Sequence, residues 1–277
     1  FGLWSSNGSG DKTFSLSGLR TSVANRFKNV ILFSSGRKLW RTNGKLSGTT
    51  SVKDFTFEDN SSMIQGNIAI SSGRAYFTVK DQFKRNFVYV SDGTEKGTQK
   101  VRRIDEFKNN PYNLLPVPDY TAVNELVYYR EDYGTDQRLV KIEGVTSDVS
   151  VILPSSGQES FTYLTSFTKF GDKLLFSAKQ GNLGREPWIS DGTTNGTFML
   201  KDINDSNQNS IEHSSSFLSC GGYALMTATD GLHGQELWIT NGSSQGTALL
   251  KDINGSSTSS QISLLCAVDG IGYFLAN

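Results

Sequence analysis

The amino-acid sequence predicts an all-β fold, and more specifically a six-bladed β-propeller with four-stranded antiparallel blades. Three observations carry this prediction: an internal repeat, short strand-like runs between Gly-, Asn- and Asp-rich turns, and complementary halves of one repeat at the two ends of the chain. A four-stranded unit of about 40–50 residues that recurs along a chain is typical of propellers.

The repeat is clearest in two segments that lie 50 residues apart. Residues 185–203 read REPWISDGTTNGTFMLKDI, and residues 235–253 read QELWITNGSSQGTALLKDI. Weaker copies or fragments lie at residues 2–8, 38–55, 88–98 and 138–144. The position of the Trp in these segments provides six repeat anchors, with steps of 36, 49, 50, 49 and 50 residues: Trp4, Trp40, Tyr89, Leu139, Trp188 and Trp238. The repeat count is therefore six.

Each repeat has the pattern of four short strands, which is best developed in residues 160–203. Apolar-rich runs at 163–170 and 173–178 are separated by Gly171-Asp172, which is typical of a tight turn. A third strand is expected at 186–190 and a fourth at 197–203, with the turn 191–196 between them. Helical periodicity of any length is absent from the sequence.

The repeats divide the single expected domain, residues 1–277, into six blades. Five of them correspond approximately to residues 17–57, 61–106, 112–153, 160–205 and 211–255, and the sixth combines 261–277 with 1–16. In the first complete repeat Phe33 lies seven residues before Trp40, and joining the chain ends places Phe274 seven residues before Trp4. We expect strands from both termini to close one blade, which removes two exposed sheet edges.

Composition limits the classes of partner. The chain has 27 Lys and Arg against 27 Asp and Glu, so it lacks the basic excess that nucleic-acid binding needs. No apolar run approaches the ~18 residues of a membrane helix. We expect neither nucleic-acid binding nor membrane insertion. The start at Phe1, without a Met or a signal-type segment, indicates a processed or excerpted piece of a chain.

The cysteines and histidines predict no metal site. Cys220 and Cys266 are too few for a disulfide scaffold, which favours two buried free thiols and leaves a single bridge as the alternative. His213 and His233 lie twenty residues apart without neighbouring Cys or His. The Asp-containing loops lack the dense spacing of an EF-hand. No metal and no cofactor are expected.

The repeat motifs closely resemble the ELWxxDGT repeat family. Glu236-Leu237-Trp238 and Lys251-Asp252-Ile253 match its consensus, Asp191-Gly192-Thr193 and Asp92-Gly93-Thr94 match its turn, and Asp230-Gly231 matches the loop before Glu-Leu-Trp. The similarity covers most of the chain and is weak between residues 112 and 152. It implies a propeller in a secreted or surface protein, often within a longer repeat array, and it implies no catalytic activity.

The recurring polar residues could be taken for an active site, for instance Glu186, Asp191 and Lys201. A catalytic constellation is normally unique in a chain, whereas these residues recur from blade to blade. Recurrence favours a scaffold role: Trp for packing between blades, Asp-Gly-Thr for the turn and Lys-Asp for surface pairing. We therefore expect no catalytic residues and no enzyme activity.

A binding site is more plausible where one copy departs from the repeat. The fourth complete segment carries tyrosines beside charged residues, a composition enriched in recognition patches: Tyr128, Tyr129, Arg130, Asp132 and Tyr133. The alternative is that this blade has drifted and its tyrosines pack against strands. Residues 80–108 are also locally basic, but interspersed acidic residues indicate a solvated face: Lys84, Arg85, Lys100, Arg102 and Arg103 are the cations.

Six Asn-x-Ser/Thr triplets would be glycosylation sites if the protein is eukaryotic and secreted: Asn7, Asn60, Asn195, Asn204, Asn241 and Asn254. The function predicted first is a non-enzymatic extracellular or cell-surface module for protein binding, adhesion or assembly. The alternative is a carbohydrate-binding propeller that uses Trp and Tyr faces. A glycan-active enzyme is the third hypothesis, and it needs a carboxylate pair facing the central channel.

Overall fold

A computed structural model describes residues 2–55, 63–83, 85–104, 119–133, 136–156, 160–205, 207–212 and 215–277. The chain divides into two compact units. Unit 1 comprises Phe1–Glu131 with Ile142–Val149, and unit 2 comprises Asp132–Lys141 with Ser150–Asn277. The described secondary structure consists of β-strands and two 3₁₀ turns, Gly10–Lys12 and Leu46–Gly48, which confirms the all-β prediction.

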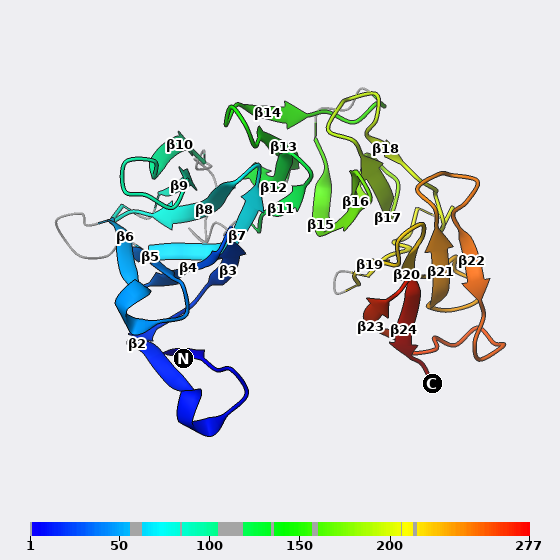
Figure 1. Cartoon of the computed structure of the whole chain (residues 1–277). Helices are drawn as coiled ribbons and strands as arrows, with labels where there is room; N and C mark the ends of the chain where they lie inside the picture. Colours follow the sequence, from blue (N-terminus) through cyan, green and yellow to red (C-terminus); the bar gives the residue numbers. More distant parts are fainter. Residues whose placement is uncertain are drawn as a thin grey trace. The chain divides into compact units, whose positions relative to one another are not determined.

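Unit 1 contains a two-stranded sheet and two four-stranded sheets (Figure 1). β1 (Gly2–Ser5) pairs with β2 (Phe14–Arg20). The strands of the first four-stranded sheet are β3 (Ala24–Phe27), β4 (Val30–Ser35), β5 (Lys38–Thr42) and β6 (Thr50–Asp54). Those of the second are β7 (Met63–Ser71), β8 (Arg74–Lys80), β9 (Asn86–Ser91) and β10 (Gln99–Arg103). In both sheets the spatial order follows the chain order, as the repeat predicts.

A third four-stranded sheet has the order β11 (Thr121–Val123), β12 (Leu126–Tyr133), β13 (Asp136–Glu143) and β14 (Val149–Ile152). Unit 2 adds two more. One comprises β15 (Thr162–Phe170), β16 (Lys173–Lys179), β17 (Arg185–Ser190) and β18 (Phe198–Met199). The other comprises β19 (Leu218–Ser219), β20 (Ala224–Ala228), β21 (Glu236–Thr240) and β22 (Ala248–Lys251). β23 (Ser263–Val268) and β24 (Ile271–Leu275) form a two-stranded sheet.

The five four-stranded antiparallel sheets correspond to the five internal blades that the repeat predicts. β18 is shorter than predicted: it covers Phe198–Met199, whereas the sequence predicts a strand over residues 197–203. Pro187 in β17 lacks an N–H group and so cannot extend the ladder with β18, although its carbonyl accepts from the N–H of Leu200. In the next sheet Leu237 occupies the equivalent position, pairs with Lys251, and β22 is longer.

The same cross-strand pair recurs between the second and third strands of four sheets. Phe33 pairs with Trp40, Phe77 with Tyr89, Phe176 with Trp188 and Met226 with Trp238. The first three pairs are stacked, with ring centroids 6.1–6.3 Å apart. In each sheet the second strand begins with the residue that closes the hairpin turn, and the first member of the pair lies three positions after that residue. The turn therefore determines which residue of the second strand lies opposite the repeat anchor in the third strand.

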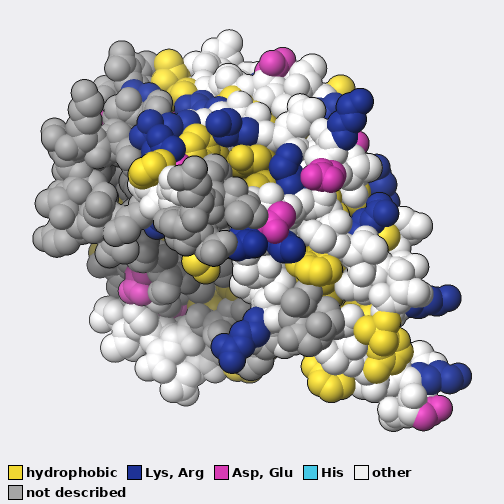
Figure 2. All heavy atoms as spheres, turned by 90° about the vertical axis from the view of Figure 1, so that its left-hand side faces the viewer, with side chains coloured by type: hydrophobic (Ala, Val, Ile, Leu, Met, Phe, Trp, Pro, Cys, Tyr) yellow, Lys and Arg dark blue, Asp and Glu magenta, His cyan; other side chains and the backbone are white. Residues whose placement is uncertain are grey.

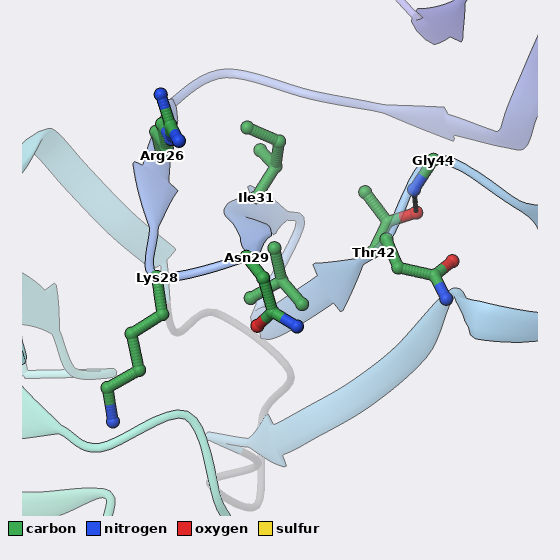
Figure 3. A pocket seen from close by; sticks show the side chains of 8 residues that line it. Arg26, Lys28, Asn29, Ile31, Thr42 and Gly44 are labelled. Atoms are coloured by element: carbon green, nitrogen blue, oxygen red, sulfur yellow. Dashed lines mark hydrogen bonds between the residues drawn. The ribbon is translucent and has the colours of Figure 1, made fainter.

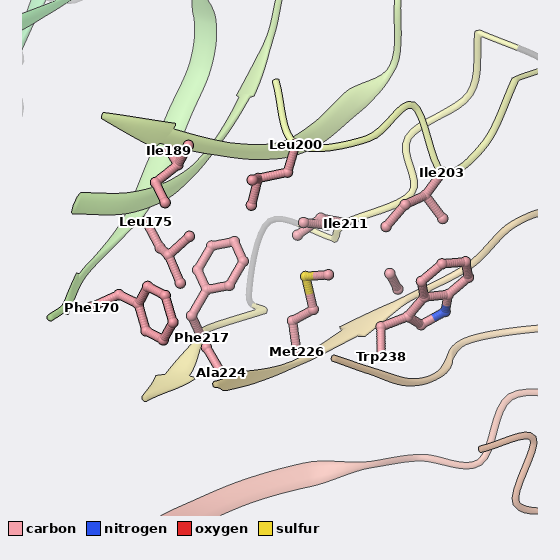
Figure 4. Packing of buried hydrophobic residues seen from close by; sticks show 11 residues of the cluster. Phe170, Leu175, Ile189, Leu200, Ile203, Ile211, Phe217, Ala224, Met226 and Trp238 are labelled. Atoms are coloured by element: carbon pink, nitrogen blue, oxygen red, sulfur yellow. The ribbon is translucent and has the colours of Figure 1, made fainter. Parts of the chain in front are cut away.

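The hydrophobic core lies between neighbouring sheets. In unit 2, Leu175, Ile189 and Leu200 of one sheet face Met226 and Trp238 of the next (Figure 4). This arrangement confirms the predicted role of the anchor in packing between blades for Trp238, which is 4% exposed. A similar cluster in unit 1 joins Phe27 and Leu39 to residues of β7 and β8. Trp4 differs from the other anchors, because 63% of its surface is exposed.

Candidate functional site

The Asp-Gly-Thr segments form a hydrogen-bonded turn, as predicted. Asp191 Oδ1 accepts from the backbone N–H of Thr193 at 2.8 Å and from its hydroxyl at 2.7 Å. Thr193 Oγ1 in turn accepts from the N–H of Gly196. The turns at Asp92 and Asn241 have the same bonds. The hydrogen bond from the Thr94 side chain is the main cause that holds the pKa of Asp92 below its usual value. These side chains are occupied in forming the turn.

The Glu of the Glu-Leu-Trp motif is an interior structural group. Glu186 and Glu236 are both fully buried. Glu186 accepts from the N–H of Ile203 at 2.9 Å and from the N–H and hydroxyl of Ser210. Glu236 accepts from the N–H of Ile253 at 2.9 Å and from the hydroxyl of Ser260. Each carboxylate thus anchors the chain that leaves the fourth strand. Burial raises the pKa of Glu186 to about 7, against the opposing effect of its hydrogen bonds.

The Lys of the Lys-Asp motif connects neighbouring sheets. Lys53 Nζ donates to the carbonyl of Thr98 at 2.7 Å, and Lys201 Nζ donates to the carbonyl of Thr247 at 3.1 Å. Lys201 also lies 5.9 Å from the ring centroid of Trp238. The predicted surface pairing is therefore wrong for these lysines, because each reaches the turn of the following sheet. It holds for Asp54, which forms ion pairs with Arg37 and Lys38.

In the fourth complete segment, the structure supports the alternative that the tyrosines pack against strands, and it corrects the predicted recognition patch at Tyr128 and Tyr129. Tyr128 and Tyr129 of β12 have no exposed surface, so they belong to the core and do not present a surface to a partner. The Tyr129 hydroxyl donates to Glu131 Oε1 at 2.8 Å, and Arg102 forms an ion pair with the same oxygen at 3.2 Å. Burial, followed by the charge of Glu131, raises the pKa of Tyr129 well above its usual value.

The remaining members of the patch stay predictions. Arg130 and Asp132 are half-buried, and Asp132 Oδ1 accepts from the amide of Gln137 at 2.7 Å. The side chain of Tyr133 lies outside the described residues. A sequence signal for the burial of Tyr129 does exist: it lies three positions after Leu126, which closes its hairpin, and this is the position of Phe33 and Phe176 in other sheets.

The basic stretch is partly neutralised by local pairing. Arg85 forms an ion pair with Asp81, and Lys100 Nζ lies 4.8 Å from the ring centroid of Phe87. Lys84 lies outside the described residues. Unit 1 nevertheless holds 19 Lys and Arg against 14 Asp and Glu, and unit 2 has 8 against 13. On the face shown in Figure 2 the dark blue side chains are accordingly more prominent than the magenta ones.

The predicted glycosylation sites differ in accessibility. Asn7, Asn195, Asn241 and Asn254 are exposed. Asn204 is 4% exposed, so the structure contradicts this site. Asn60 lies outside the described residues.

Cys220 and Cys266 are both free thiols; Cys220 is buried as expected, but Cys266 is exposed, which corrects the expectation of two buried thiols. His233 Nδ1–H donates to Asp230 Oδ2 at 2.7 Å, and this hydrogen bond raises the pKa of the imidazole. His213 lies outside the described residues. Within the described part of the chain, no three His, Cys, Asp or Glu side chains gather to hold a metal ion.

The described residues include no helix long and apolar enough to cross a membrane.

In the described part of the chain, two of the hollows each lie within a single unit. The first, of 260 Å³, lies in unit 1 between the β3–β4 hairpin and the turn after β5 (Figure 3). Arg26, Lys28, Asn29 and Thr42 line it, and the N–H of Gly44 donates to Thr42 Oγ1 at its rim. The second, of 160 Å³, lies in unit 2 and is mostly polar. Its polar lining consists of Glu212, Ser215, Ser216, Thr227, Gln235 and Ser263. We refer to it as the hydroxyl-lined cavity.

No known protein-family model matches the chain, and no curated protein matches its sequence. Solved structures do match its fold. Prolyl oligopeptidase B from Galerina marginata is 13% identical with a TM-score of 0.55, over 95% of this chain and 38% of that protein. A puromycin hydrolase is 8% identical with a TM-score of 0.53, over 86% and 41%. Oligopeptidase B from Leishmania major is 10% identical with a TM-score of 0.52, over 88% and 36%.

The chain therefore spans about two fifths of the length of these neighbours. At this identity the likeness concerns the fold alone, which is all-β and built from four-stranded antiparallel sheets.

Proposed function

We propose that this chain is a non-enzymatic β-propeller module that binds a partner outside the cell or at its surface. The observation that carries this proposal is that the recurring polar side chains are engaged in structural bonds. Glu186 and Glu236 hold buried backbone and hydroxyl groups, Asp191 holds its turn, and Lys201 holds the next turn. A rigid scaffold with varied loops suits recognition, because the loops can change without loss of the core.

We further propose that β23, β24, β1 and β2 form a sixth blade. The register of the other sheets supports this step. Ile271 closes its hairpin turn opposite Val268, and the residue three positions later is Phe274. In four other sheets that position pairs with the aromatic anchor. Phe274 is therefore the proposed partner of Trp4, whose surface is 63% exposed. Antiparallel pairing then places Tyr273 opposite Ser5.

A designed disulfide tests the sixth blade. In a Cys220→Ser/Cys266→Ser background, Ser5→Cys with Tyr273→Cys is expected to form an intramolecular bridge on mild oxidation, because directly opposed residues have suitable Cα separations. Ser5→Cys with Val268→Cys, which the register keeps apart, is the matched control and is expected to remain reduced. Free thiols in the first variant, or bridges between two molecules, contradict closure within one chain.

Turnover assays and localisation test the functional proposal itself. The named activities of the structural neighbours suggest peptide substrates, and the glycosidase hypothesis adds glycosides. We expect no turnover above that of the Glu186→Gln/Glu236→Gln double variant, with folding of both proteins checked by circular dichroism. Turnover that the double variant loses contradicts the proposal. So does an antibody stain that finds the protein only inside intact cells of its source.

A further inference from the structure

In three sheets a hydroxyl pair joins the second strand to the first strand or to the residues just before it. Ser22 and Ser34 lie 2.8 Å apart, Thr165 and Ser177 lie 2.9 Å apart, and Ser215 and Thr227 lie 3.0 Å apart. Each pair is separated by twelve residues in the sequence. In the last two-stranded sheet the residues with this spacing and register are Ser263 and Leu275, so Ser263 faces no second hydroxyl.

The hydroxyl-lined cavity lies at this departure from the repeat. Ser215 and Thr227 line it from the β19–β20 sheet, and Ser263 lines it from the start of β23. Gln235 stands directly before β21, and Glu212 precedes Ser215. In an antiparallel sheet, the start of one strand and the end of the next lie at the same edge. The cavity is therefore built at one end of two packed sheets, where the connecting loops can vary.

The lining groups select a class of ligand. Hydroxyls of Ser215, Thr227 and Ser263 and the amide of Gln235 can each donate and accept hydrogen bonds. Ile262 and Leu264 supply an apolar wall. Glu212 is the one ionisable group among the lining residues described, and no cation lines the cavity, which disfavours an anion. Glu212 also interacts electrostatically with Arg185, which offsets part of the charge that would attract a cation.

We propose that the hydroxyl-lined cavity binds the ring of a neutral sugar, most simply the terminal residue of a glycan. Many hydroxyl groups on a ring with an apolar C–H face match polar side chains on one wall and aliphatic side chains on the other. The volume of 160 Å³ is below that of pockets for drug-sized ligands, about 300–1,000 Å³, which suits one sugar ring rather than an extended chain. This inference rests on the proposed function, because it requires binding without turnover, and it names the partner as a glycan.

Saturation-transfer NMR of the full chain with single sugars tests the proposal. The probes are glucose, galactose, mannose and N-acetylglucosamine at millimolar concentration, with glucuronate and glucosamine as charged counterparts. At least one neutral sugar is expected to bind more tightly than its charged counterparts. Thr227→Val is expected to weaken this binding about three- to tenfold, the effect of one lost neutral hydrogen bond, and Gln235→Leu at least as much.

Thr165→Val is the matched control, because it breaks the same kind of hydroxyl pair away from the cavity. Its affinity is expected to stay within twofold of the original chain. Three results overturn the sugar site. They are the absence of a saturation-transfer signal from every neutral sugar, tighter binding of a charged sugar, and an equal loss of affinity in Thr165→Val and Thr227→Val. Those results leave the disulfide and localisation tests untouched. Hydrolysis of the methyl glycoside of a bound sugar, in which water replaces methanol at the anomeric carbon, would instead refute the proposed function while retaining the binding site.

Discussion

The buried carboxyl of Glu186 makes a sharp prediction about pH and stability. Its pKa rises from 4.5 to about 7 in the folded protein because it is removed from water. The folded state therefore binds a proton more tightly than the unfolded state, and stability falls as pH rises through this interval. At about 1.4 kcal/mol per pKa unit, the full loss is about 3 kcal/mol, most of it between pH 5 and pH 8.

Glu186→Gln removes the titration and keeps most of the shape. One oxygen becomes an NH₂ group, so at least one of the bonds from Ile203 and Ser210 is lost, at a cost of about 1 kcal/mol. The variant is expected to be less stable than the original chain at pH 5 and more stable at pH 8. The difference between the two proteins thus changes sign within this range.

Urea unfolding at pH 5, 6, 7 and 8, followed by circular dichroism, measures this difference. The His233–Asp230 pair raises the pKa of His233 and contributes in the same direction, so the comparison between the two proteins, rather than either curve alone, carries the conclusion. Asp172→Asn, at an exposed turn position, is the control and should leave the pH dependence unchanged. A stability difference between Glu186→Gln and the original chain that is constant from pH 5 to pH 8 refutes the reasoning.

Three further substitutions test the repeat geometry. Gly196→Ala would place its Cβ against the Asp191 carboxylate and break the turn, so we expect a loss of about 1–3 kcal/mol in the free energy of unfolding, measured with urea. Gly222→Ala, which meets no atom within 4 Å, should be close to neutral. Lys201→Met should cost about 1 kcal/mol and shift the Trp fluorescence, because it removes the bond to the following turn. If a sixth blade follows β22, Lys251 should contact its turn in the same way, and Lys251→Met should lower the free energy of unfolding by a similar amount. An unchanged stability of this variant argues against a sixth blade closed by both termini.

The sequence alone predicts three strands of the repeat at residues 160–203 well, because β15, β16 and β17 agree with the expected runs to within one residue. It overestimated β18 because the ladder depends on the N–H that Pro187 lacks, and a hydrophobicity pattern does not record that group. It also left Tyr129 either in a recognition patch or packed against strands, because composition alone does not distinguish the two positions. Counting from the hairpin turn places Tyr129 in the core position.

The recurring polar residues show that recurrence in the sequence identifies structural residues but does not define their exact structural role. Recurrence correctly assigned Asp191 to a turn, and it also explains Glu186 and Lys201, although the latter reaches a neighbouring sheet rather than the surface. For Glu186 and Lys201 the distinction depends on three-dimensional neighbours that lie 17 to 46 residues away in the chain, beyond any local motif. A departure from a recurring structural contact, by contrast, marks a position that is available for binding, and this supports the hydroxyl-lined cavity. The hydroxyl pair recurs in other sheets, and in the last sheet Leu275 stands where the second hydroxyl would be. Ser263 therefore has no hydroxyl opposite it and can face a ligand in the cavity.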